Sequence, residues 1–225
     1  MGFSLIANDF FEYGVWSMRG KVATMFLLVA TPAMAEDVTV LAFGDSLTQG
    51  YGLPEAQGLV PQLDAWLAAK GVKVDLINAG VSGDTTAGGA ARVDWSLTPE
   101  VDAMIVTLGG NDLLRGLDPS DARSNLRAIL ESARSRDVEV LLVGMKAPGN
   151  YGAEYQTAFD SIYPDLAQEF GTLYFENFFA GLGQDDPAQA RRYFQPDGIH
   201  PNSEGVERIV EALGPAVVDL VLRAE

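Results

Sequence analysis

The chain has 225 residues, 48% of them hydrophobic, so it can bury one substantial core and a single domain is the default expectation. Its formal net charge of -16 disfavours nucleic acid and anionic membrane surfaces as partners. It has no cysteine and one histidine, which excludes disulfides, thiolate nucleophiles, cysteine-ligated zinc and the usual histidine-rich catalytic zinc site. We therefore expect no zinc site of these kinds and no stable membrane anchor. Because no feature of the sequence indicates an obligate interface, we also expect a monomer.

The N-terminal region is typical of an export signal. Two basic residues, Arg19 and Lys21, precede a short apolar stretch at residues 22–30, and small residues ending at Ala35 form a cleavage site. The apolar stretch is too short to span a bilayer. We predict a signal peptide over residues 18–35, cleaved near Ala35, and a mature protein in the periplasm or outside the cell.

The residues before this signal fit no signal-peptide pattern. Met18 is followed directly by a basic residue, so we hypothesise that it is the true start and that residues 1–17 are an extension ahead of it. No linker, repeat or low-complexity block divides the remainder. We therefore expect residues 36–225 to form a single domain.

From residue 36 onward, apolar runs alternate with amphipathic segments. Strands are predicted at residues 38–43, 74–77, 104–108, 138–143 and 172–175. Strands separated by helices predict an α/β fold, a three-layer α/β/α sandwich around a parallel sheet of about five strands. Ligands of such folds bind where strands reach their carboxyl ends.

Four helical segments lie between and after these strands. One carries Leu59, Leu63, Trp66 and Leu67 on one face and ends at Gly71. The next opens at Asp118-Pro119, a cap followed by a first-turn proline, with Leu126, Ile129, Leu130 and Ala133 on one face. A third, over residues 155–166, should be kinked or split at Pro164. The closing helix, over residues 203–222, should break at Gly214-Pro215.

Residues suited to catalysis follow the predicted strands. Ser46 lies in Gly44-Asp45-Ser46-Leu47, where a strand meets a helix and backbone N–H groups with a positive dipole end favour a developing oxyanion. A plain helix cap would also explain this serine. The second glycine of a Gly-x-Ser-x-Gly elbow is missing, so the α/β-hydrolase fold does not fit.

Two further segments could supply oxyanion donors. Gly80 follows the second predicted strand and would let its backbone N–H approach a ligand, although an ordinary glycine-rich turn is the simpler alternative. Asn111, after the third strand, offers a neutral amide donor, although it could instead be a left-handed turn residue.

The only histidine, His200, lies three residues after Asp197. A carboxylate at this spacing can accept the Nδ1–H of the imidazole, fix its tautomer and stabilise the imidazolium formed during catalysis. The alternative is a core histidine beside a capping aspartate. We favour the catalytic interpretation, because four separate segments lead to the region where the site of an α/β protein lies.

These four segments, in this order, resemble the SGNH (GDSL-type) hydrolases, a family named for the residues represented here by Ser46, Gly80, Asn111 and His200. The resemblance covers the whole predicted mature chain and is strongest to bacterial esterases of the acyl-CoA thioesterase I, lysophospholipase L1 and arylesterase type. Supporting stretches are residues 108–116, 150–152 and 159–164. The resemblance implies the flavodoxin-like SGNH fold, which tolerates a proline at Pro164.

The resemblance also implies a mechanism that needs no cofactor and no metal. Ser46 attacks an acyl carbon, His200 takes its proton and Asp197 holds the imidazole, while the backbone N–H groups of Ser46 and Gly80 and the side chain of Asn111 receive the oxyanion. The expected function is a serine esterase for carboxylic esters, and for thioesters, acting on small-molecule or lipid substrates.

The loop around Pro148 should form a wall of the acyl pocket, with Asn150 and Tyr151 contacting substrate. Two alternatives remain at this stage: a carbohydrate O-acetylesterase with the same fold, and a binding module that has lost catalysis.

Overall fold

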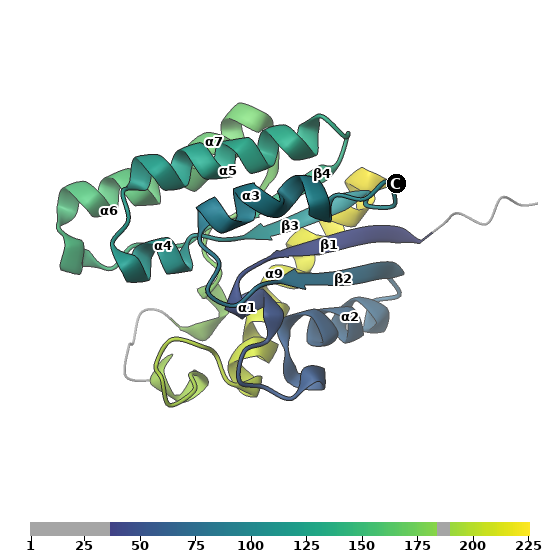
Figure 1. The fold of residues 1–225 in the computed structure, drawn as a ribbon. Coiled ribbons are helices and arrows are strands. Elements are labelled where there is room, and N and C mark those ends of the chain that lie inside the picture. The colour runs from purple at the N-terminus through teal and green to yellow at the C-terminus, as the bar shows by residue number, and fades with distance from the viewer. Residues whose placement is uncertain (1–36, 184–189) are drawn as a thin grey trace, which may run out of the picture. The chain divides into compact units, whose positions relative to one another are not determined.

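The computed structural model describes residues 37–183 and 190–225. Five strands form one sheet in the order β2-β1-β3-β4-β5, and every neighbouring pair is parallel (Figure 1). The strands are β1 (Val38–Gly44), β2 (Val74–Gly80), β3 (Ala103–Thr107), β4 (Glu139–Val143) and β5 (Leu173–Phe175). The predicted parallel sheet is confirmed. The signal peptide and the N-terminal extension predicted above lie outside the described residues.

Helices cover both faces of this sheet. The helices are α1 (Ser46–Gln49), α2 (Leu59–Ala69), α3 (Thr86–Ser96), α4 (Gly110–Arg115), α5 (Pro119–Arg134), α6 (Ala153–Asp160), α7 (Ile162–Phe170) and α9 (Ser203–Ala224). Short 3-10 turns are η1 (Glu55–Gln57), η2 (Gly149–Tyr151), η3 (Ala180–Leu182) and η4 (Arg191–Tyr193). Figure 1 shows α3, α5 and α7 on one side of the sheet and α2 and α9 on the other, which confirms the three-layer sandwich.

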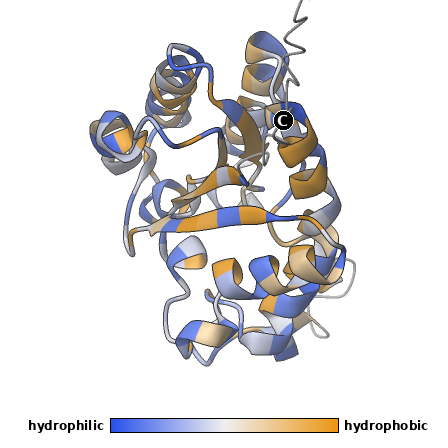
Figure 2. Cartoon of the chain, turned by 90° about the vertical axis from the view of Figure 1, so that its right-hand side faces the viewer, coloured by the Kyte–Doolittle hydropathy of each residue, from blue (hydrophilic) through white to orange (hydrophobic). Residues whose placement is uncertain are grey.

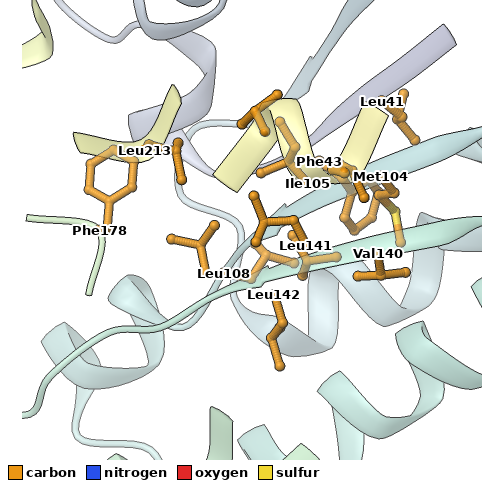
Figure 3. Packing of buried hydrophobic residues seen from close by; sticks show 14 of the residues in the cluster. Leu41, Phe43, Met104, Ile105, Leu108, Val140, Leu141, Leu142, Phe178 and Leu213 are labelled. Carbon is orange, nitrogen blue, oxygen red and sulfur yellow. The ribbon is translucent and has the colours of Figure 1, made fainter. Parts of the chain in front are cut away.

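The core consists of the central strands and the helix faces that pack on them. Strand β3 is buried along its whole length, as expected for a parallel strand covered on both faces. The residues labelled in Figure 3 come from β1, β3 and β4 and from the segments packed around them. In Figure 2 hydrophobic and hydrophilic residues are interspersed along the helices, as expected for amphipathic helices that cover a sheet.

Two proline predictions have different outcomes. The predicted split at Pro164 is confirmed, because α6 ends at Asp160 and α7 begins at Ile162, which places Pro164 in the first turn of α7 where no helical acceptor is lost. The predicted break at Gly214-Pro215 is wrong: α9 runs unbroken through both residues.

The reason for the unbroken helix is its packing against α2. A Cβ atom on Gly214 would lie 2.6 Å from the Trp66 ring, so the glycine allows α9 and α2 to pack closely. Pro215 is exposed, where water can satisfy the carbonyl that loses its helical donor. The packed face therefore maintains the helix across the proline.

The ends of the strands are aligned. Gly44 at the end of β1 is in register with Gly80 of β2 and with Thr107 of β3. The segments that follow these three strands therefore emerge at the same level of the sheet. Strand β2 is longer than predicted and includes residues 78–80, so Gly80 belongs to the strand rather than to the loop after it.

Candidate active site

Three predicted residues meet where the strands reach their carboxyl ends. Ser46 is the first residue of α1, and its Oγ lies 2.8 Å from Nε2 of His200. Nδ1 of the same imidazole lies 2.7 Å from Oδ2 of Asp197. The fold thus brings together a hydroxyl, an imidazole and a carboxylate separated by about 150 residues of chain, in a hydrogen-bonded series that can move a proton from the serine to the histidine.

Asp197 is held by its own turn. Its Oδ1 accepts the backbone N–H groups of Ile199 at 2.9 Å and His200 at 3.0 Å. The hydrogen bond to the His200 ring, followed by these two backbone bonds, lowers the pKa of Asp197 to about 2. An ionised carboxylate only accepts hydrogen bonds, so Nδ1 of His200 is the protonated nitrogen and Nε2 can accept the serine proton.

Two contacts that the sequence did not indicate support the histidine loop. The Tyr51 ring lies 4.6 Å from the His200 ring, centroid to centroid. Gln195 joins the segment after α1 to the segment that carries His200, because its Nε2 donates to the backbone oxygens of Tyr51 at 2.8 Å and Pro201 at 3.0 Å. The two contacts made by Tyr51 join segments more than 140 residues apart in the chain, so no local pattern could have shown them.

The candidate oxyanion donors differ in what they already bind. Ser46 begins a helix, so its backbone N–H has no acceptor within that helix. Asn111 lies in the first turn of α4 and is not a left-handed turn residue; the left-handed residue is Gly109 before it, with φ 117°. Nδ2 of Asn111 lies 2.9 Å from the backbone oxygen of Asp84 and 3.2 Å from Oδ2 of Asp45.

Gly80 is placed differently from the expectation. Its backbone N–H donates to Oδ1 of Asn78 at 3.0 Å, so this donor is already occupied. A Cβ at this position would lie 2.2 Å from the backbone N of Gln49, which explains why a glycine is needed where β2 passes α1. The structure therefore gives Gly80 a packing role and leaves its N–H bonded within the protein.

Asp45 is the N-cap residue of α1 and precedes the nucleophile Ser46 in the chain. It is buried, its Oδ1 caps α1 by accepting the Leu47 N–H at 3.0 Å, and its Oδ2 faces Asn111. Burial raises the pKa of Asp45 to about 6, although the hydrogen bonds from Leu47 and Asn111 oppose this change. Its position between the glycine and the serine of the motif was visible in the sequence, but its contact with Asn111 was not.

A cavity of about 370 Å³ opens beside Ser46. Its walls are mainly apolar, and the segment after β4 contributes Asn150 and Tyr151, the two residues predicted to contact substrate. The residues that line it are Asp45, Ser46, Leu47, Gly110, Asn111, Leu113, Leu114, Met145, Lys146, Pro148, Asn150, Tyr151, Phe179, Phe194, Gly198 and Ile199. Such a pocket accommodates an apolar group bound next to a nucleophile.

Within residues 37–183 and 190–225, no cluster of three or more histidine, cysteine or acidic residues is arranged to hold a metal ion. In the same ranges, no helix is both long enough and apolar enough to cross a membrane.

A serine, histidine and aspartate in this order of contact, at the carboxyl ends of a parallel sheet, define a serine hydrolase of the α/β/α class. The model of the GDSL-like lipase/acylhydrolase family matches residues 42–208, and the chain belongs to that family.

Individual relatives agree with this assignment. The chain is 37% identical over 195 residues to Esterase TesA of Pseudomonas aeruginosa, an alignment that covers 86% of this chain and 94% of the relative. It is 35% identical over 206 residues to Thioesterase 1/protease 1/lysophospholipase L1 of Escherichia coli strain K12, covering 90% and 94%. Among solved structures, AlinE4, described as an SGNH-hydrolase family esterase, superposes with a TM-score of 0.67 at 44% identity, over 83% of this chain and 98% of that chain. The expected resemblance to SGNH hydrolases is confirmed.

Proposed function

We propose that this protein is a serine esterase that hydrolyses carboxylic esters, and thioesters, whose acyl chains extend beyond acetyl. One observation carries the proposal: the Ser46 hydroxyl, 2.8 Å from the His200 imidazole, faces a mainly apolar cavity of about 370 Å³. An acetyl group would leave much of that apolar wall in contact with water, whereas a longer acyl chain would cover it. The names of the relatives, which include an esterase and a thioesterase, support the same class of substrate.

The reaction runs through an acyl-enzyme. Ser46 Oγ forms a bond to the acyl carbon while its proton passes to Nε2 of His200, and the carbonyl π electrons move to the oxygen. When the tetrahedral intermediate collapses, the bond to the leaving alcohol or thiol breaks and His200 returns the proton to it. Water then attacks the acyl-enzyme by the same route, releasing the acid and free Ser46. Asp197, ionised at neutral pH, stabilises the imidazolium in each half-reaction.

The oxyanion needs donors close to the nucleophile. We assign two of them to the backbone N–H of Ser46 and to Nδ2 of Asn111, whose longer bond, to Asp45, would be shared with or replaced by the oxyanion. For a third donor we propose Gly83 in place of Gly80. In the described part of the chain the Gly83 N–H has no acceptor, its φ is +83°, and its neighbour Asp84 already contacts Asn111.

The first test is hydrolysis of p-nitrophenyl esters from acetate to palmitate. Wild-type protein, Ser46→Ala and the matched control Ser124→Ala, a serine on the distant helix α5, are compared. We expect turnover of medium or long chains, lost in Ser46→Ala and retained in Ser124→Ala. Activity confined to acetate would favour the carbohydrate O-acetylesterase alternative, and hydrolysis unchanged in Ser46→Ala would overturn the proposal.

Export rests on the sequence pattern alone. We propose that the segment ending at Ala35 is removed on the way to the periplasm or the exterior. N-terminal sequencing of protein expressed with its full leader is expected to begin near Glu36. An intact N-terminus on protein recovered from the cytoplasm would contradict this proposal.

A further inference from the structure

One arginine outside the catalytic residues contacts two of the segments that build the site. Arg92 lies on α3, and its Nε donates to Oδ2 of Asp84 at 2.6 Å while its Nη2 donates to the backbone oxygen of Gly44 at 2.9 Å. The guanidinium also lies over the Phe43 ring, 4.0 Å from its centroid. The side chain is only 23% exposed, so these contacts are partly shielded from water.

Both acceptors lead directly to proposed oxyanion donors. Gly44 is the last residue of β1 and is two residues before Ser46, whose backbone N–H is one donor. Asp84 accepts the Asn111 amide through its backbone oxygen at 2.9 Å while its carboxylate binds Arg92. The Arg92 guanidinium therefore contacts both the segment that leads to Ser46, through Gly44, and the residue that binds the Asn111 amide, Asp84. The Ser46 backbone N–H and the Asn111 amide must both face the substrate oxygen that becomes negative.

The orientation of the Asn111 amide depends on this connection. The two N–H bonds of an amide nitrogen lie in one plane at a fixed angle, so fixing one of them on the Asp84 oxygen fixes the direction of the other. The second N–H, which is directed to Oδ2 of Asp45 at 3.2 Å, is the one that an oxyanion would share or take over. A small displacement of the Asp84 backbone would therefore turn this donor away from the reacting atom.

The chain provides space for this arrangement. A Cβ on Gly88 would lie 2.3 Å from Oδ1 of Asp84, so the glycine lets the carboxylate lie against the first turn of α3. Arginine suits the bridge because its planar guanidinium presents donors in fixed directions, and here two of them reach two acceptors at once. Lysine offers one compact ammonium at the end of a flexible stem and cannot reproduce the geometry.

We propose that Arg92 is a positioning residue for the oxyanion hole, acting on Asn111 through Asp84 and on the Ser46 segment through Gly44. This inference rests on the proposed esterase function. It predicts that loss of the guanidinium lowers kcat and leaves KM nearly unchanged, because the donors act on the transition state and not on the bound ester.

The test is a double-mutant cycle on a p-nitrophenyl ester that the wild type hydrolyses. Arg92→Met keeps an unbranched aliphatic side chain and removes the guanidinium, and it is made alone and together with Asn111→Ala. We expect roughly a 10- to 100-fold loss of kcat in the otherwise wild-type protein, with KM within about twofold. In the Asn111→Ala background the same change should cost clearly less than in the wild-type background, because the donor that Arg92 orients through Asp84 is already gone and only the contact with Gly44 remains to be lost.

Controls separate this role from simple destabilisation. Arg123→Met removes an arginine of α5 that pairs with Asp165 of α7, and it should retain wild-type kcat. Arg92→Lys keeps the charge without the two-acceptor geometry and should lie between wild type and Arg92→Met in kcat; if Arg92→Met does not fold, Arg92→Lys replaces it in the cycle.

The outcomes also distinguish this inference from the proposed function. Equal loss of kcat in both backgrounds, or wild-type kcat in Arg92→Lys, would overturn the positioning role while Ser46-dependent hydrolysis persists. Hydrolysis that survives in Ser46→Ala would instead overturn the esterase proposal.

Discussion

Oδ2 of Asp45 lies 3.2 Å from Nδ2 of Asn111, so a buried carboxyl group faces the amide that is proposed to stabilise the oxyanion. The same carboxyl caps α1 through Leu47 N–H and so fixes the start of the helix that carries Ser46. The Asp45 carboxyl group therefore links the helix that carries Ser46 to Asn111 of α4. Burying the Asp45 carboxyl group lowers the stability of the folded protein by an amount that depends on pH.

Asp45→Asn should stabilise the protein at neutral pH. The pKa of Asp45 rises from its ordinary value of 3.8 to about 6 on folding, mainly because of burial. Between these values the folded state binds more protons than the unfolded state, so stability falls as the pH rises through this window. Above it, the ionised carboxylate costs at most about 3 kcal/mol.

Urea unfolding of wild type and Asp45→Asn at pH 4 and at pH 7 measures this effect. The free energy of unfolding of Asp45→Asn, taken relative to wild type, should be higher at pH 7 than at pH 4. Any unfavourable contact between the new amide and Asn111 contributes equally at the two pH values, so it cancels when the two differences are compared. A difference that does not change with pH would show that Asp45 titrates as an ordinary carboxyl.

Asp197→Asn should remove most of the turnover without unfolding the protein. The lowered pKa of Asp197, about 2, keeps it ionised above that value, so it holds the protonated Nδ1 of His200 across the neutral range. An amide can hold the wrong tautomer, and the corresponding change in Ser-His-Asp enzymes costs roughly 10⁴-fold in kcat. Steady-state kinetics at pH 7 to 8 checks this; a loss below about tenfold would mean that Asp197 is only a turn residue.

Asn111→Ala should lower kcat by roughly 10²–10³-fold, the cost of losing one oxyanion donor. The Michaelis constant should change little, because the donor acts on the transition state. Labelling with a fluorophosphonate, which reacts with an activated serine, checks that Ser46 remains accessible in the variant. A decrease of less than tenfold in kcat would leave Asn111 as a structural residue of α4.

Gly80→Ala should destabilise the protein, by about 1–3 kcal/mol, through overpacking against α1. Because the Gly80 N–H already binds Asn78, we expect kcat of the folded variant at low temperature to fall by less than an oxyanion-donor loss would cause. Thermal unfolding and kcat are measured on the same preparation. Because alanine keeps the backbone N–H, a variant of wild-type stability with a 10²-fold loss of kcat would show that Gly80 affects the geometry of the site and has more than a packing role.

Neighbouring substitutions in α9 should have opposite effects on stability. Gly214→Ala places a Cβ 2.6 Å from the Trp66 ring and should destabilise by about 1–3 kcal/mol. Pro215→Ala, at an exposed position inside the continuous helix, restores a helical donor and should stabilise by about 1–3 kcal/mol. Thermal unfolding of each variant gives the sign. A destabilised Pro215→Ala would mean that the proline contributes more by restricting the unfolded chain.

The order of the strands and of the helices α2, α5, α6, α7 and α9 could be predicted because it depends on local patterns. Helix α3, between β2 and β3, was not predicted, because its sequence contains two glycines and few large apolar residues. Apolar runs such as residues 104–108 and amphipathic faces such as that of α5 can be recognised within a short stretch of sequence. Alternation of such strands and helices implies a parallel sheet. Ser46, Asn111 and His200 could be selected for a related reason: residues that follow strands in such a sheet converge at one edge. The end of β2 was missed because residues 78–80 are polar or small and carry no strand signal.

The sequence by itself therefore determined the fold class, the order of the strands and the residue types of the triad, since these depend on periodicity and on chemistry that each residue carries with it. Only the tertiary structure decided which polar groups of separate segments are bonded to one another: Asn111 to Asp84 and Asp45, and Arg92 to Gly44. It also decided that α9 continues through Pro215. Hydrogen bonds and packing between segments far apart in the chain depend on distances in space, and no local pattern in the sequence encodes them.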